Sequence, residues 1–397
     1  MSVSPQLALK TVDQLRPMDL PALPERPLVP VLIANYNYAR YIGEAIDSVL
    51  AQTYGNFEVC ICDDGSKDNS VEVVRSYAFR DPRIKLIVQE NGGQGSALNA
   101  AWRLAGGQIL ELLDSDDVFL PSKLAKLVSC YRASAGAGLV VHPVTCVTSD
   151  LRVLQRRVPR TINEGWLGPE VLRGIGHRMP TCSGVSLRRQ VADRVFPADE
   201  RFREWADSVV TYRALCVAQV ASIDQALALY RIHGRNLSTG LAGPNVADVQ
   251  RRLLLMQRVC ADLAEFALRQ RGVKISPEAV GKTVCAENRL AEQLLRGEGI
   301  DETLLRSITV GGRARLWRLV FACPRLLGRE LLYLYWGQSR KAAFFKWLLV
   351  RMFPSVWPVR RSRDHKGPVW DFKLVTRSRS AEYPGSGWSR ALVFAGA

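Results

Sequence analysis

Between residues 28 and 113, short apolar runs alternate with stretches in which apolar residues recur every three or four positions. Apolar runs of four to eight residues predict buried strands, and the wider spacing predicts amphipathic helices. The predicted strands cover residues 28–34, 57–62, 84–88 and 109–113, and the predicted helices cover about 42–50, 69–79 and 96–104. Strands separated by helices of this length imply right-handed βαβ units, so we expect an α/β domain with a mostly parallel sheet and flanking helices.

Polar residues gather immediately after each predicted strand. The carboxyl ends of parallel strands meet at one edge of a sheet, and this edge is where open α/β folds bind their ligands. The polar groups, in chain order, are Asn35-Tyr36-Asn37, Asp63-Asp64, Asn91 to Gly95, and Asp114 to Asp117. We therefore expect one edge of the sheet to carry the functional side chains.

The segment Asp114-Ser115-Asp116-Asp117 places three carboxylates at the end of a buried strand. Carboxylates this close together repel one another unless a cation lies between them. Hard divalent cations such as Mg²⁺ bind oxygen ligands of this kind, usually one or two carboxylates together with substrate phosphates. The sequence therefore favours a metal site, and the alternative is an acidic turn that caps the helix starting near Pro121.

Five sequence blocks, in the same order and spacing, resemble family 2 glycosyltransferases. The resemblance is strongest up to residue 120 and extends to about residue 238. The blocks are Val31 to Asn37, Ser48 to Tyr54, Cys62 to Asp68, Asn91-Gly92-Gly93 with Ala97-Leu98-Asn99, and Leu113 to Asp117. The resemblance implies a GT-A fold, a nucleotide-sugar donor, a divalent metal (Mn²⁺ or Mg²⁺) and inversion at the anomeric carbon.

The resemblance also implies roles for single residues. Tyr36 matches an aromatic residue that stacks on the donor base, unless it only fills the junction between strand and helix. Asp64 matches a residue that hydrogen-bonds the base, and the glycines before the helix at Ser96 suit either a phosphate or a plain turn. The implied donor-binding positions are Ala34, Tyr36, Asp64, Gly93, Asn99, Asp114, Ser115, Asp116 and Arg231, and the implied metal positions are Asp114, Asp116, Asp117 and His233.

Residues 230–238 resemble the Tyr-Arg-x-His block that closes the family's domain. Arg231 and Arg235 would pair with phosphate oxygens. His233 would contact the diphosphate or complete the metal sphere, since His is a common metal ligand. The alternative is a solvated loop with no contact to the donor.

Inverting transfer needs a general base that takes the proton of the acceptor hydroxyl. The family carries this base on a helix after a strand of small residues. Residues 181–187 match the strand, and Asp207 matches the base. Ala206 departs from the family, which often has an acid there, and Glu204 and Asp199 are rival bases. The non-catalytic alternative for Asp207 is a helix N-terminal acid that the helix dipole stabilises.

The 397 residues carry 54 Lys and Arg against 38 Asp and Glu, a net charge of +16. This length allows two or more domains. Nine Cys without metal-like spacing indicate a reduced, cytoplasmic compartment. Residues 1–27 show no signal-peptide pattern and are rich in Pro, so we expect a flexible leader. No apolar run reaches the length of a transmembrane helix.

Helical periodicity returns over residues 246–271 and 277–296, and the composition changes from Arg306 to Arg363. That stretch carries thirteen Lys or Arg against one acid, Glu330, with many aromatic residues between them. Interfacial helices have this pattern, so we expect peripheral attachment to an anionic membrane surface, or else a basic subdomain packed on the catalytic domain. No zinc-finger or RNA-binding signature supports nucleic-acid binding.

These patterns predict four segments: a leader over 1–27, a GT-A domain over 28–240, a helical extension over 241–361 and a disordered tail over 362–397. We expect an inverting, metal-dependent hexosyltransferase that uses a UDP-sugar to elongate a glycan, lipid-linked and at the inner face of the membrane, in cell-surface polysaccharide synthesis. The alternative is a non-catalytic sugar-nucleotide-binding or scaffold protein. A sugar-phosphate nucleotidylyltransferase is disfavoured because no Gly-rich loop with a following Arg comes after Ala34.

Overall fold

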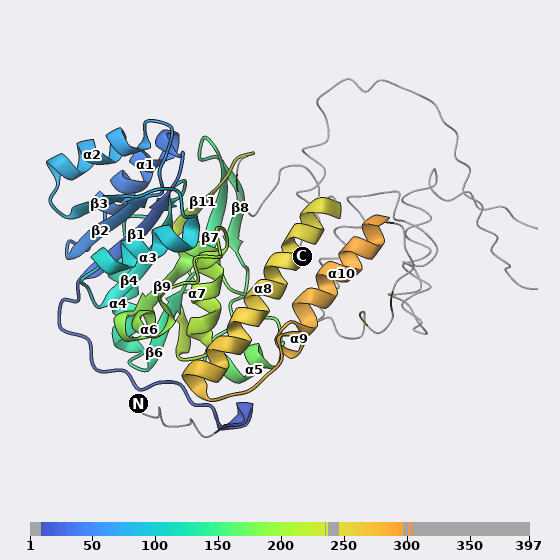
Figure 1. Cartoon of the computed structure of the whole chain (residues 1–397). Coiled ribbons are helices and arrows are strands. Elements are labelled where there is room, and N and C mark those ends of the chain that lie inside the picture. Colours follow the sequence, from blue (N-terminus) through green and yellow to red (C-terminus); the bar gives the residue numbers. More distant parts are fainter. Residues whose placement is uncertain (1–8, 235, 237–245, 297–300, 302–303, 305–397) are drawn as a thin grey trace, which may run out of the picture. The chain divides into compact units, whose positions relative to one another are not determined.

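The structure is a computed structural model that describes residues 9–234, 236, 246–296, 301 and 304. The basic, aromatic stretch from Arg306 onward and the expected disordered tail lie outside the described residues. Within the described part, a seven-stranded sheet carries helices on both faces, and a second sheet has four strands (Figure 1). This arrangement confirms the predicted α/β class with flanking helices.

The seven-stranded sheet has the order β10-β6-β9-β4-β1-β2-β3. Neighbouring strands run parallel except for β9, which is antiparallel to both β4 and β6. The four strands predicted from the sequence agree with the structure to within one residue at each end. The strands are β1 (Val29–Asn35), β2 (Phe57–Asp63), β3 (Ile84–Val88), β4 (Ile109–Asp114), β6 (Ala137–Val141), β9 (Val185–Arg188) and β10 (Gln219–Ser222).

Alternating side chains of the strands enter two separate apolar cores. In β1, Val31 and Ile33 face one core and Leu32 faces the other, as expected for a strand buried on both faces. The first core is covered by α1 (Ala39–Leu50), α2 (Ser70–Arg80) and α4 (Lys123–Ala133). The second is covered by α3 (Gln94–Leu104), α5 (Gly168–Leu172), α6 (Arg189–Val195) and α7 (Ala206–Leu215).

The four-stranded sheet has the order β5-β11-β7-β8. Its strands are β5 (Val118–Phe119), β11 (Ala228–Ile232), β7 (Val144–Thr148) and β8 (Val153–Val158). Strand β11 pairs with β5, which directly follows the acidic segment 114–117. This pairing brings Arg231 and His233, at the end of β11, to the acids at the end of β4.

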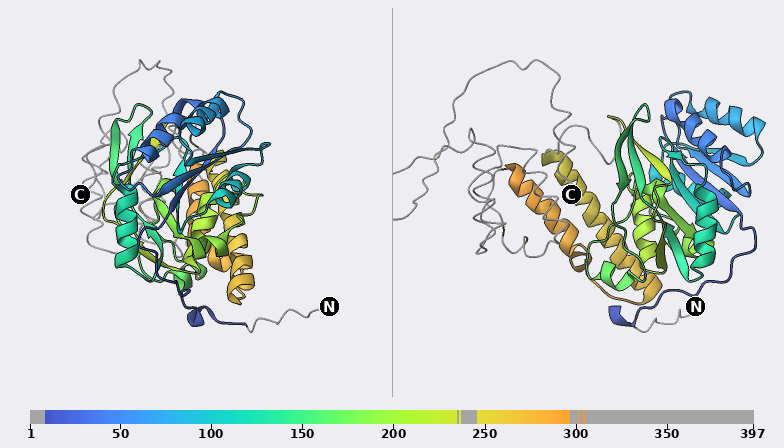
Figure 2. Two further views of the ribbon diagram at one scale, coloured as in Figure 1. Left: turned by 90° about the vertical axis from the view of Figure 1, so that its left-hand side faces the viewer. Right: turned by 180° about the vertical axis from the view of Figure 1, so that it is seen from behind.

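Three helices follow the sheets: α8 (Val246–Arg271), α9 (Pro277–Val280) and α10 (Lys282–Arg296). They confirm the helical extension as far as residue 296, with a break at Gly281. Helix α8 packs against α7 on one side and α10 on the other (Figure 2). Among the described residues, no helix combines the length and the apolar content that crossing a bilayer would require.

Residues 9–27 do not behave as the predicted flexible leader. Leu15 is 1% exposed and belongs to the second core, next to the short helix η1 (Val12–Gln14). The Met18 N–H donates to the Val217 carbonyl at 2.8 Å, and the Arg188 guanidinium donates to the Pro21 carbonyl. The Pro-rich composition misled the prediction, because proline also suits an extended segment that is fixed along a domain surface.

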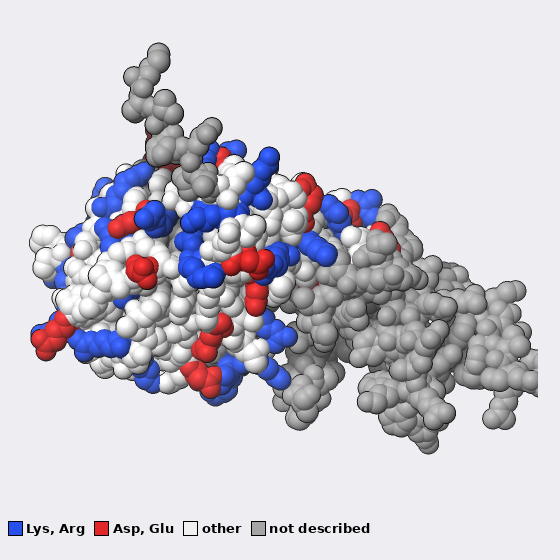
Figure 3. Space-filling view, turned by 90° about the horizontal axis from the view of Figure 1, so that it is seen from below, with Lys and Arg blue, Asp and Glu red and all other residues white. Residues whose placement is uncertain are grey.

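The surface of the described residues carries charges of both signs. In the view of Figure 3, Lys and Arg side chains are interspersed with Asp and Glu rather than gathered in one stripe. The described residues also form exposed ion pairs, including Arg157 with Asp224 and Arg173 with Asp13. The strong basic excess of the chain therefore does not produce a single-sign face in this view.

Candidate active site

The carboxyl ends of β4, β1, β2 and β3 meet at one edge of the sheet, as predicted. In this edge, Asn35 pairs with Asp63 in register, and its Nδ2 donates to Asp63 Oδ2 at 2.7 Å. Ala34 lies in β1 between Cys62 and Asp114. Tyr36 follows β1 with 42% of its surface exposed, so its ring is accessible to a ligand.

Asp114 ends β4 and Asp207 lies in the first turn of α7, and the two are close enough for their charges to interact. Burial, and then the charges of Asp207 and Asp116, raise the pKa of Asp114 well above its ordinary value. Burial also raises the pKa of Asp207, while a hydrogen bond from the Gln94 side chain acts in the opposite direction. Two residues separated by 93 positions thus share one crowded, acidic site.

His233 binds the carboxylate of Asp116. Its Nε2 lies 2.8 Å from Asp116 Oδ2, and both side chains are at most 10% exposed. The imidazole stacks on the ring of Tyr41 with 5.0 Å between centroids, and the ring of Tyr38 meets its edge at 5.7 Å. Burial, and then Asp116 and Asp114, raise the pKa of Tyr38, which places its phenol beside both acids.

Asp117 does not lie in the open part of the site. It is 0% exposed, and Ser183 Oγ donates to its Oδ2 at 2.6 Å while the Arg231 backbone N–H donates to its Oδ1 at 2.9 Å. Both carboxylate oxygens are therefore used within the protein. The expected metal role of Asp117 stays a prediction; in this structure the acid connects the end of β4 to β11 and to the segment before β9.

The side chain of Arg231 also forms hydrogen bonds within the protein, and the residue is only 1% exposed. Its Nε donates to the Asp116 carbonyl at 2.7 Å, Nη1 to the Ser149 carbonyl, and Nη2 to Glu44 at 2.7 Å. The guanidinium also lies over the Tyr41 ring, 4.7 Å from its centroid. The expected contact to a donor phosphate would therefore require this side chain to exchange some of these hydrogen bonds, which now stabilise the edge of the sheet.

The carboxylate of Asp64 holds the loop after β3. Its oxygens accept from the N–H groups of Gly92 at 2.9 Å and Gly93 at 2.7 Å, and from Gln89 Nε2 at 2.8 Å. Gly93 has φ +89°, and a Cβ built on it would lie 2.6 Å from the Arg203 Cα. The glycine is required by this close approach of two loops and by its backbone conformation.

The N-terminus of α3 is not open to a phosphate. The N–H groups of Gln94 and Gly95 donate to the carbonyls of Arg203 and Phe202, both at 3.0 Å. The plain-turn alternative for the glycines is therefore the better description of this segment. The loop before α7 occupies the positions that an anion would need.

Asn99 and Ser115 are both covered by protein. Asn99 is 0% exposed; its Nδ2 donates to the Ala198 carbonyl at 2.9 Å, and its Oδ1 accepts from the Ala198 N–H at 2.7 Å. The expected contact between Asn99 and the donor would require one of these bonds to be exchanged, because both ends of this amide fix the loop after α6. Ser115 is 4% exposed and lies between the acids of the β4 end.

The segment that carries the predicted base differs in detail from the prediction. Residues 182–184 form a short helix, η2 (Cys182–Gly184), and the strand β9 begins only at Val185. Helix α7 begins at Ala206, and the rival base Glu204 forms an ion pair with Arg251. The other rival, Asp199, pairs with Arg201 in an exposed turn.

The residues at the sheet edge fit a hard divalent cation only in part. Asp114 and Asp116 supply carboxylate oxygens, and their mutual repulsion is what a cation would relieve. In the described part of the chain, no three or more His, Cys, Asp or Glu side chains are grouped as a metal site. A cation held by two carboxylates would need phosphate oxygens and water for the rest of its ligands, as is usual for Mg²⁺.

Several residues of the site were not foreseen from the sequence. Beneath the acids, Lys123 Nζ lies 2.6 Å from Glu111, both 0% exposed, and donates to the Ser183 carbonyl at 2.7 Å. Ser183 Oγ in turn accepts from the Asp114 N–H at 3.1 Å. No local motif marks these partners, because they lie on three separate elements, β4, α4 and η2, which only the tertiary fold brings together. Tyr38 and Tyr41 could have been found from their place in the helix start directly after β1.

Residues 31–196 match the family model for glycosyl transferase family 2. An uncharacterised glycosyltransferase of Nostoc sp. is 37% identical over 212 residues, which are 52% of this chain and 66% of that protein. A chondroitin synthase of Escherichia coli is 41% identical over 186 residues, 47% of this chain and 26% of that enzyme. The chain thus spans only part of the length of these relatives.

Two further likenesses extend over more of the chain. The succinoglycan biosynthesis protein ExoO of Rhizobium meliloti is 29% identical over 315 residues, 76% of this chain and 90% of that protein. Among solved structures, TarS residues 1–349 of S. aureus align with 79% of this chain and 92% of theirs, with 15% identity and a TM-score of 0.47. The family model, together with relatives named as glycosyltransferases, shows that the chain belongs to glycosyl transferase family 2.

Proposed function

We propose that this chain transfers a sugar, with inversion, from a nucleotide-sugar to a hydroxyl group of an acceptor glycan. The observation that carries the proposal is the meeting of Asp207 with Asp114 at the carboxyl edge of the sheet. An inverting transfer needs a base on one side of the anomeric carbon and groups that hold the leaving diphosphate on the other. In this proposal Asp207 is the base, and Asp114 belongs to the groups that hold the diphosphate.

Asp207 is the base in this proposal. Its raised pKa fits a carboxylate that must take a proton from a hydroxyl. Glu204 is the weaker candidate because its carboxylate is engaged by Arg251. Ala206, where the family often has an acid, is 0% exposed and packed in an apolar core, so an acid at that position would be buried at a cost.

The donor is proposed to be a UDP-sugar with its base at Tyr36. The exposed ring offers a face for stacking, which contributes about 1–3 kcal/mol per base. Asp64 lies at the end of β2. To accept a hydrogen bond from the imide N–H of uracil, one of its oxygens would have to accept a second bond beside the one from the loop after β3. Guanosine and thymidine are the competing bases.

A divalent cation, Mn²⁺ or Mg²⁺, is proposed to be held by Asp114 and Asp116. When bound, such an ion neutralises the charge that develops on the departing diphosphate. His233 fixes the orientation of the Asp116 carboxylate, and Arg231 fixes the backbone at the same residue. The protein's own part is therefore to present two oriented carboxylates, with the remaining ligands coming from the donor and from water.

The acceptor is proposed to be a growing polysaccharide, lipid-linked and reached at the inner face of the membrane. Likeness to a chondroitin synthase and to a succinoglycan biosynthesis protein supports the polysaccharide part. The membrane part rests on the thirteen cations and many aromatic residues between Arg306 and Arg363. Co-sedimentation of the whole chain with neutral and with anionic vesicles tests it: equal binding to both, or to neither, contradicts the electrostatic attachment.

The central experiment measures nucleotide release from a panel of nucleotide-sugars with Mn²⁺ or Mg²⁺, with and without oligosaccharide acceptors. A thermal-shift series identifies the donor first, because a ligand at 100 times its Kd stabilises the fold by about 2.7 kcal/mol. Turnover that is lost in EDTA supports the proposal. Donor binding without any turnover, hydrolysis included, would instead support the non-catalytic sugar-nucleotide-binding alternative.

A further inference from the structure

Helix α8 lies outside the region that matches the family model, and it contacts the segment that carries Asp207 at both ends. At the first end, Arg251 forms an ion pair with Glu204, with Nε 3.1 Å from Oε1 and Nη2 against Oε2. Glu204 stands three residues before Asp207, in the turn that leads into α7. The pair therefore connects the first half of α8 to the start of α7.

At the other end, Arg213 in the last turn of α7 forms a two-pronged ion pair with Asp262 of α8. The two side chains are 12% and 7% exposed. The same guanidinium donates to the carbonyls of Val195 at 2.8 Å and Pro197 at 2.9 Å. Arg213 thus joins α8 to both α7 and the end of α6.

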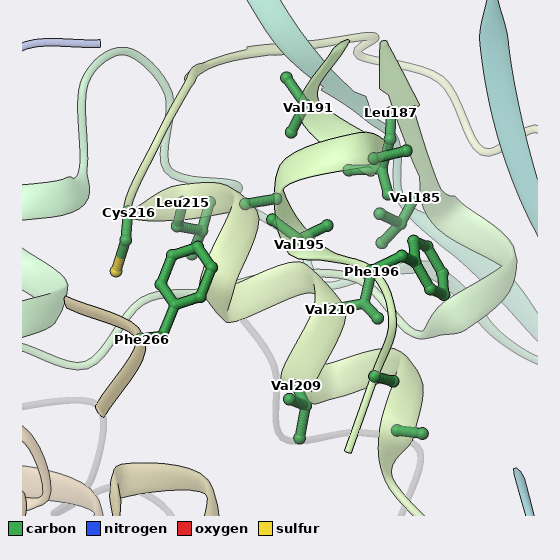
Figure 4. Close-up of a cluster of buried hydrophobic side chains, with 14 of the residues drawn as sticks. Val185, Leu187, Val191, Val195, Phe196, Val209, Val210, Leu215, Cys216 and Phe266 are labelled. Atoms are coloured by element: carbon green, nitrogen blue, oxygen red, sulfur yellow. The ribbon is translucent and has the colours of Figure 1, made fainter. Parts of the chain in front are cut away.

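Apolar side chains of α7 and α8 also belong to one core. Met256, Val259, Leu263 and Phe266 of α8 belong to the same core as Val209 and Val210 of α7. In Figure 4, Phe266 lies beside Leu215 and Cys216, at the end of α7. The two helices therefore contribute to one apolar core in addition to the two ion pairs.

The turn before α7 needs such support. Trp205, directly before Ala206, has φ +64°, a left-handed conformation that is unfavourable for a bulky side chain. A conformation of this kind persists only where the surroundings impose it. Two contacts hold the turn: Arg251 pairs with Glu204, and Gln94 Oε1 accepts the Ala206 N–H at 2.9 Å.

We propose that α8, through Arg251 and Asp262, positions helix α7 so that Asp207 is held at the distance and angle that proton transfer requires. The inference rests on the proposed function, in which Asp207 is the base. Arg251 and Asp262 are positioning residues, because they touch neither the acids at the sheet edge nor Asp207. The proposed donor-binding residues Tyr36, Asp64, Asp114 and Asp116 lie at the ends of β1, β2 and β4 rather than on α7 or α8.

This division predicts an effect on turnover without an effect on donor binding. A misplacement of about 1 Å can reduce the rate by as much as about 10²-fold. We expect Arg251→Gln and Glu204→Gln each to lower kcat about tenfold, within that range, and to leave the KM for the donor unchanged. A general loss of structure would change both quantities and the melting temperature.

The experiment uses the full chain and five variants, with Asp207→Asn as a reference. Arg251→Gln and Glu204→Gln break the pair, and the double variant Arg251→Glu with Glu204→Arg restores it with the charges exchanged. Arg269→Gln is the matched control, because Arg269 lies on the same helix and pairs with Glu265 in an exposed i,i+4 contact away from α7. Asp262→Asn tests the second ion pair while keeping an oxygen for Arg213.

The expected result is a lower kcat in Arg251→Gln and in Glu204→Gln, recovery of kcat in the double variant with exchanged charges, and wild-type kinetics in Arg269→Gln. If Asp207→Asn is inactive but Arg251→Gln and Asp262→Asn keep the wild-type kcat, the inference is overturned. Loss in Glu204→Gln without recovery in the exchanged pair would also overturn it, since Glu204 would then act by itself. Full activity of Asp207→Asn would instead refute the proposed base.

Discussion

His233 Nε2 lies 2.8 Å from Oδ2 of Asp116, and Tyr41 stacks on the imidazole that makes this contact. The arrangement fixes the carboxylate of an acid at the sheet edge through a residue 117 positions later in the chain. A ligand oxygen that is held in this way loses little rotamer freedom when it binds an ion. We therefore expect His233 to orient Asp116 through this hydrogen bond rather than to bind the metal itself.

Replacing His233 by Phe should weaken metal-dependent binding of the nucleotide. Removing a hydrogen-bonding partner of a metal ligand typically costs 10–100-fold in metal affinity or activity. Titration of Mn²⁺ in the presence of UDP would measure the effect, with the melting temperature as a control for folding. An unchanged Mn²⁺ affinity would show that the contact does not serve the ion.

Asp116 and Asp117 should respond differently to substitution, although they are neighbours in the chain. Asp116→Asn should abolish transfer with little loss of stability. Asp117→Ala should lower the free energy of unfolding by about 1–3 kcal/mol, because Ser183 and the Arg231 N–H would be left without an acceptor. Urea unfolding of both variants, beside activity assays, compares them; equal stability losses would contradict this division of roles.

Asp207→Asn should reduce turnover by about 10²–10⁴-fold while donor affinity stays nearly unchanged. The amide keeps the shape of the side chain but cannot accept the proton. Single-turnover rates and UDP binding measured on the same preparation separate the two effects. If Glu204→Gln caused the larger loss, the base would have to be reassigned.

The buried pair of Glu111 and Lys123 should make stability depend on pH. Burial raises the pKa of the Glu111 carboxyl from 4.5 to about 7, which the charge of Lys123 only partly opposes. The folded chain then binds this proton more tightly than the unfolded chain does. The contribution of Glu111 to the free energy of unfolding therefore falls as pH rises from about 4.5 to about 7.

Two variants test this account of the pair. Lys123→Met alone should cost about 3–5 kcal/mol near neutral pH, because it leaves Glu111 buried without a cation. The double variant with Glu111→Gln should recover most of that loss and should show a smaller change between about pH 5 and about pH 7. A double variant as unstable as the single one would show that shape, not charge, is what the site requires.

The sequence predicted what local patterns determine. The four strands, the polar edge and helix α8 follow from apolar period and turn residues, and the structure confirms them. The partners of Asn99 and Arg231 could not be predicted, because Ala198 and Glu44 lie 99 and 187 residues away along the chain. A motif predicts which side chains lie at the edge of the sheet, but it does not show whether these side chains already form hydrogen bonds with other parts of the protein.

The close approach of Gly93 to Arg203 limits how this site can change during evolution. A side chain at residue 93 would collide with the backbone of residue 203, so the loop after β3 cannot vary by itself. That loop follows the strand next to Asp64, and the other loop leads to Asp207. Substitutions that adapt the site to a new donor at the first loop should therefore arise together with changes in the second, and the two segments should diverge as one unit.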